Sequence, residues 1–154
     1  MKKLFLFFLI LPAFNKTIAQ KKPGGEWSAG LRLGGSTGIS LKSHAKSNDY
    51  AFEFLAANSF DEKMKGISLG ILYEKLAPIS DNGRLSAIAG GGFSFNFRDR
   101  TNFGVTGILG FDWRLKAAPI NLQLDWAPTF FFINTSYFSG VNGAFSVRYI
   151  LNKK

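Results

Sequence analysis

The chain has 154 residues, no cysteine, one histidine and a formal net charge of +9. This length corresponds to one domain, and the missing cysteines exclude disulfides and thiolate metal sites, while one histidine excludes a histidine-rich metal centre. The basic residues are scattered along the chain instead of being gathered on one element, which argues against nucleic-acid binding. We therefore expect no cofactor, no metal and no nucleic acid.

The first 19 residues have the pattern of a secretory signal peptide. Met1-Lys2-Lys3 is a short basic start, residues 4–14 are apolar apart from one proline, and Thr17-Ile18-Ala19 places small residues before a cleavage site. About 11 apolar residues are too few for a membrane anchor, which needs about 20. We predict cleavage after Ala19 and a mature domain over residues 20–154.

In the mature chain, apolar and polar residues alternate along successive segments, which is the period of a β-strand with two unlike faces. The clearest segment is Ile120–Trp126, where Asn121, Gln123 and Asp125 share the polar face. Turn signals rich in glycine and asparagine separate the segments. The predicted strands are residues 26–35, 39–42, 50–56, 67–74, 85–97, 103–114, 120–126 and 141–151.

The polar faces carry small residues and few charges. Gly, Ser, Thr and Asn dominate them, and the charged residues are evenly divided between the two signs. An eight-stranded barrel has an interior just wide enough for side chains, and buried charges there must be paired. We predict a charge network inside the barrel, formed by Arg32, Lys42, Glu53, Glu74, Asp112, Arg114, Asp125 and Arg148.

Two environments suit strands of this kind. In a soluble sandwich or a lipocalin-like barrel, the apolar faces would form the core or surround an apolar ligand. In a membrane barrel, they would face lipid. The second alternative is favoured because the polar faces are too poor in charge for a water-exposed surface, and because tryptophan and tyrosine lie near strand ends, as in interfacial girdles.

The strand number, the alternation and the predicted export resemble the small eight-stranded outer-membrane barrels of the OmpA/OmpX-like class over residues 26–151. The resemblance implies an all-β fold, an eight-stranded antiparallel up-and-down transmembrane β-barrel with short turns. It also implies an outer-membrane location and contact with outer-membrane lipid and lipopolysaccharide. Insertion by the barrel-assembly machinery and a monomeric state are further expectations. The class ends in a strand with a terminal aromatic residue, whereas this chain ends with Leu151 and residues 152–154.

Some barrels of this class modify lipid A, a reaction that would require a histidine with a serine and an acidic partner at the outer rim. His44, beside Ser43, Ser47 and Asp49, is the candidate here. With both termini in the periplasm, His44 is expected in the first periplasmic turn, solvated and on the wrong side for this chemistry. We therefore expect a non-enzymatic barrel with no catalytic residue, acting in envelope structure or surface interaction.

The last hairpin is the best candidate for an interaction surface, because its apolar residues break the alternation. It could equally fold over the barrel mouth or stay at the membrane interface. Nearby basic residues could meet lipopolysaccharide phosphates. The hairpin residues proposed as a contact surface are Phe130, Phe131, Phe132, Tyr137 and Phe138, and the basic residues are Lys63, Lys65, Arg98 and Arg100.

Overall fold

A computed structural model describes residues 24–59, 65–98, 100–134 and 136–151. The predicted signal peptide and Lys63 lie outside these residues. Within the described ranges, no helix is long and apolar enough to cross a membrane.

All regular structure in the described residues is β-strand. The strands are β1 (Trp27–Gly34), β2 (Ser36–His44), β3 (Tyr50–Ser59), β4 (Gly66–Pro78), β5 (Leu85–Phe97), β6 (Thr101–Arg114), β7 (Ile120–Trp126), β8 (Thr129–Phe131), β9 (Tyr137–Ser139) and β10 (Gly143–Ile150).

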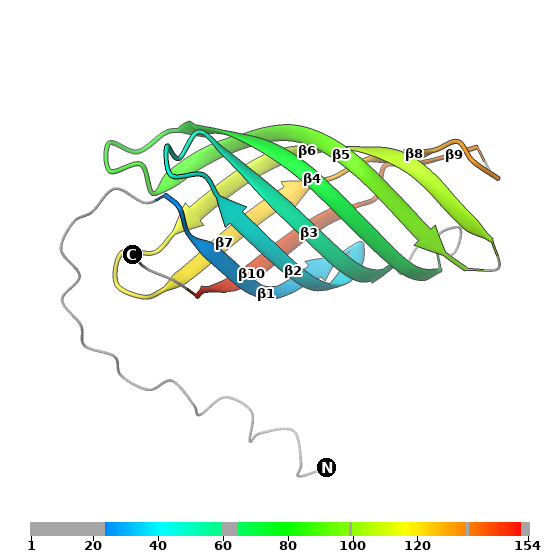
Figure 1. Ribbon diagram of the computed structural model, residues 1–154, viewed down its shortest axis with the longest axis horizontal. Helices are drawn as coiled ribbons and strands as arrows, with labels where there is room; N and C mark the ends of the chain where they lie inside the picture. Colours follow the sequence, from blue (N-terminus) through cyan, green and yellow to red (C-terminus); the bar gives the residue numbers. More distant parts are fainter. Residues whose placement is uncertain (1–23, 60–64, 99, 135, 152–154) are drawn as a thin grey trace, which may run out of the picture.

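The strands form a closed antiparallel barrel (Figure 1). Each strand from β1 to β5 pairs with the next, β5 pairs with β6, and the ring closes through β6–β7, β7–β10 and β10–β1. β8 continues the course of β7 along β6, and β9 pairs with β8, so ten strands occupy eight positions. The predicted eight-stranded antiparallel barrel is therefore confirmed. The last hairpin therefore consists of β8 and β9, which extend the wall beyond β7.

The alternation in the sequence becomes the two faces of the barrel wall. On β7, Leu124 and Trp126 are exposed, while Asn121, Gln123 and Asp125 are buried. On β10, exposed and buried residues alternate without a break. Because side chains of a strand point alternately to opposite faces, the large apolar residues cover the outside and the polar residues fill the interior.

Two glycines of β5 allow a close approach between strands. A Cβ atom on Gly90 would lie 1.9 Å from the carbonyl oxygen of Tyr73, and one on Gly92 would lie 1.9 Å from that of Ile71. No side chain fits at such distances, so both positions require glycine. The glycines of Gly90-Gly91-Gly92 thus serve the close packing of β5 against β4.

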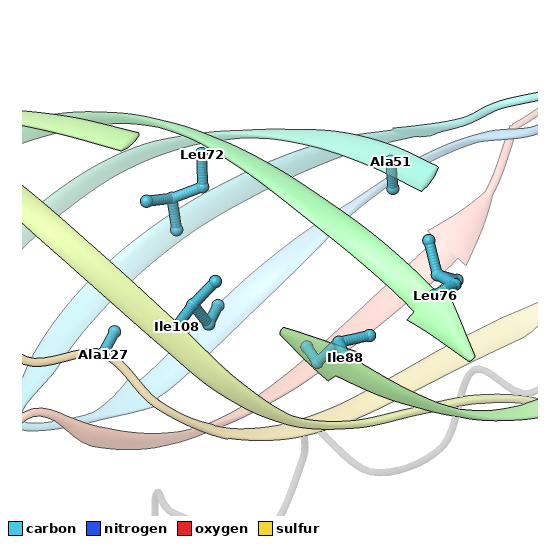
Figure 2. Packing of buried hydrophobic residues seen from close by; sticks show 6 residues of the cluster. All are labelled: Ala51, Leu72, Leu76, Ile88, Ile108 and Ala127. Carbon is cyan, nitrogen blue, oxygen red and sulfur yellow. The ribbon is translucent and has the colours of Figure 1, made fainter. Parts of the chain in front are cut away.

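The interior also contains an apolar cluster that the sequence analysis did not predict. Figure 2 shows these side chains, which come from β3, β4, β5, β6 and the residue after β7. They occupy inward positions in phase with the polar residues of the same strands. The lumen is therefore filled partly by aliphatic packing and partly by charges. The cluster consists of Ala51, Leu72, Leu76, Ile88, Ile108 and Ala127.

Candidate functional site: the ion-pair network inside the barrel

The structure places all eight residues of the expected charge network inside the barrel. They come from β1, β2, β3, β4, β6, β7 and β10, and none is more than 5% exposed. Two charges taken out of water cost several kcal/mol unless they are paired and hydrogen-bonded. Each of the eight groups lies within 4.0 Å of a group of opposite charge, which provides this compensation.

Arg32 and Asp125 form a two-point pair. The Nη1 and Nη2 atoms of Arg32 each donate to one carboxylate oxygen of Asp125, at 2.7 Å in both cases. The planar guanidinium fits the carboxylate in this arrangement, which adds directionality to the charge attraction. The side-chain amide of Gln123 donates to the same carboxylate at 2.9 Å. Asp125 is therefore held from two sides.

Lys42 is the centre of the network. Its Nζ donates to Glu74 at 2.5 Å, to Asp112 at 2.9 Å and to the side-chain oxygen of Gln123 at 2.6 Å. An ammonium group has three donors, and all three are used. Since Lys42 lies on β2 and Asp112 on β6, four positions further around the ring, this contact spans the lumen.

Arg148 forms the third group. It donates to Glu53, to Ser40 at 2.5 Å and to the side-chain oxygen of Asn121 at 2.9 Å. Gln123 then joins the groups, because its oxygen also accepts from Arg148 at 3.0 Å and its amide donates to Glu53 at 3.2 Å. The uncharged Gln123 thus touches all three ion-pair groups.

The end of the barrel that carries the termini holds Arg114 and His44, and His44 is buried there instead of solvated. Arg114 donates to Asn48 at 2.5 Å, and its Nε lies 3.7 Å from Asp112. His44 is the last residue of β2 and is only 2% exposed, with Nε2 3.4 Å from Asp112. The prediction of a solvated turn histidine is wrong, because β2 extends to His44 and its inward phase buries the ring.

The surroundings of His44 are buried and polar. Both ring nitrogens of His44 and the hydroxyl of Ser86 lack hydrogen-bond partners among the described protein atoms. Both side chains are buried, with His44 2% and Ser86 0% exposed. Among the described residues, no group of three or more His, Asp or Glu side chains could hold a metal ion.

The last hairpin is divided between the two faces. Phe130, Phe132 and Phe138 are exposed, but Phe131 is buried at 3% exposure, so including Phe131 in a contact surface is wrong. The reason is the regular alternation of β8, which turns its middle residue outward and both neighbours inward. Tyr137 is partly buried.

Outside, the hairpin packs against the barrel wall. The ring of Phe132 meets that of Phe103 edge to face at 5.3 Å, and it stacks with Phe130 at 6.5 Å. The nearby basic residues Lys65, Arg98 and Arg100 are exposed. This arrangement indicates that the β8–β9 hairpin extends the apolar wall of the barrel and does not fold over the barrel mouth.

Comparison with models of protein families, with curated proteins and with solved structures found no match for this chain.

Proposed function

We propose that this chain is an exported protein whose barrel spans the outer membrane and acts without catalysis, in envelope structure or surface interaction. The observation that carries the proposal is the inverted distribution of side chains. Large apolar residues are exposed around the barrel, whereas charged residues of seven strands are buried in its interior. Lipid is the solvent in which such an exterior is stable.

The filled interior supports a structural or contact role over transport. The buried side chains of Arg32, Lys42 and Arg148 pair with carboxylates of other strands inside the lumen, and the aliphatic cluster occupies further space. A barrel of eight strands has no room for an open channel beside these groups. Function then depends on the outer wall and the rims.

The two alternatives receive less support. A carrier of an apolar ligand needs an apolar cavity, but here most large apolar side chains face outward, the interior aliphatic residues pack together and the interior charges bind one another. A lipid-modifying enzyme needs an accessible nucleophile and base at the outer rim. His44 lies buried at the opposite end, on the side of the termini.

Membrane fractionation of the full chain tests the proposal. We expect the mature protein in the outer-membrane fraction, solubilised only by detergent, with a band that changes mobility when the sample is boiled. A closed barrel resists unfolding in cold detergent, so the two forms migrate differently. Recovery in the soluble fraction without detergent would overturn the proposal.

A matched pair of variants tests lipid contact directly. Leu109 lies in the middle of β6 and Leu151 just beyond β10, and their exposures are nearly equal at 55% and 58%. In a membrane, Leu109→Arg should cost about 2–4 kcal/mol and Leu151→Arg only about 0–1, since the cost depends on depth. In a soluble barrel both would be neutral. Folded yield in lipid vesicles, with unfolding in urea, measures the difference.

A further inference from the structure

Along the barrel axis, the apolar outer surface starts at the same height on all sides at the end with the termini. At the other end, it reaches two different heights on two sides of the barrel. At the end of the barrel with the termini, exposed aromatic residues mark its edge on four strands. These are Trp27 on β1, Tyr50 on β3, Trp113 on β6 and Tyr149 on β10. Tryptophan and tyrosine prefer the membrane–water interface, so this ring defines one interfacial level.

On the side of β1 to β3, the apolar surface extends only a short distance along the barrel axis. The outward apolar residues of β1 run from Trp27 to Leu33, and the chain then turns at Gly35. Those of β3 run from Tyr50 to Ala56. With a rise of about 3.4 Å per residue and a tilt of about 40°, each run is about 16 Å high.

On the opposite side the surface is taller. The outward apolar residues of β6 run from Trp113 to Phe103, which corresponds to about 26 Å by the same arithmetic. Phe130 and Phe132 stand beside this upper part. Figure 1 shows the β1–β2 hairpin ending well short of the β5–β6 and β8–β9 hairpins.

Asn58 and Val105 make the difference measurable. Each points outward, eight residues along its strand from the girdle aromatic, Tyr50 or Trp113. At this level β6 presents an exposed valine, but β3 presents an exposed amide that pairs with Thr37 of β2. An amide within a hydrocarbon band about 25 Å thick would be costly.

We propose that the barrel reduces the thickness of the hydrocarbon layer beside β1–β3 by about 10 Å. The short apolar surface of these strands would then be in contact with a locally thinned leaflet. The inference rests on the proposed membrane insertion. Tilting the barrel would not remove the mismatch. It would move Trp27 and Trp113, on different sides of the ring, out of the interface in opposite directions.

Single cysteines test the inference, because the natural chain has none. Asn58→Cys and Val105→Cys are refolded separately into dioleoylphosphatidylcholine vesicles and exposed to a water-soluble maleimide. Thiols react as thiolates, which form only in contact with water. We expect Asn58→Cys to react at least about tenfold faster than Val105→Cys, which lipid should protect.

The other outcomes separate the two proposals. Protection of both cysteines from the maleimide would overturn the proposed thinning but leave the proposed membrane insertion intact. The same result would be obtained if a second copy of the chain covered β1–β3, and this too would overturn the thinning. Reaction of both would show that the barrel is not inserted, which overturns the proposed function as well. Ser43→Cys, at the lower edge of the same side, should react. Its protection alongside a reactive Asn58→Cys would indicate a tilted barrel and overturn the inference.

Discussion

Arg32 and Asp125 are 93 positions apart in the sequence, yet they form a two-point ion pair in the interior, with both contacts at 2.7 Å and both side chains inaccessible to solvent. β1 and β7 do not pair with each other, because β10 lies between them. The contact therefore bridges the inside of the wall across an intervening strand. It holds the curvature at the point where the ring closes.

Removing one member of this pair should be strongly destabilising. Arg32→Ala leaves a buried carboxylate without its main partner, and we expect a loss of about 3–5 kcal/mol of unfolding free energy. Arg32→Ala combined with Asp125→Ala should lose less than the two single changes together. Urea unfolding in detergent micelles, followed by tryptophan fluorescence, measures all four proteins. Additive losses would show that the two groups do not interact.

Replacing Gly92 should be more costly than replacing Gly70. Both face the interior on neighbouring strands, but an added Cβ at Gly92 lies 1.9 Å from the carbonyl oxygen of Ile71. At Gly70 the nearest atom, the Cβ of Leu55, is 3.5 Å away. Gly92→Ala must push strands apart and should cost about 1–3 kcal/mol, whereas Gly70→Ala should be near neutral. Equal effects in the same unfolding assay would contradict the close approach of β4 and β5.

Truncation of Phe131 should destabilise the protein much more than truncation of the adjacent Phe130. Phe131 is 3% exposed and Phe130 is 46% exposed. Phe131→Ala opens a cavity at the top of the interior and should cost about 3–5 kcal/mol. Phe130→Ala removes an outer side chain and should cost much less in micelles. Thermal unfolding of both variants gives the comparison, and a larger effect at Phe130 would place β8 in the wrong phase.

His44 should matter for stability and not for lipid chemistry. Its ring is buried beside Asp112, so His44→Ala should lower the unfolding free energy by about 1–3 kcal/mol. Mass spectrometry should show the same lipid A species in cells with and without the protein. If the natural protein altered the acyl chains and His44→Ala abolished that change, the enzymatic alternative would be correct.

The inward and outward faces of most strands could be predicted from the sequence, because alternation with a period of two residues is a local signal. It placed Asn121, Gln123 and Asp125 inward without any knowledge of their partners. It could not select Arg32 as the partner of Asp125, since that choice depends on how far the strands are staggered when the ring closes.

Three errors have physical reasons as well. Leu72, Ile88 and Ile108 were missed because they are apolar residues in phase with polar ones, and composition alone assigns them to neither face. His44 was misplaced because the length of β2 is fixed by its pairing with β3, which continues to Ala51. Phe131 was misplaced because residues 130–133 are all apolar, which hides the alternation. β8 keeps the register of β7 along β6, and this register turns Phe131 inward.

The network that fills the lumen also links the two halves of the polypeptide. Three ion pairs among its eight charged residues join β1–β5 to β6–β10: Arg32 with Asp125, Lys42 with Asp112, and Arg148 with Glu53. A sheet in which β1 and β10 have not yet paired can satisfy none of them. Partly assembled intermediates therefore gain little from these charges, and the complete ring gains all three contacts together. The polar interior thus makes assembly of the barrel cooperative.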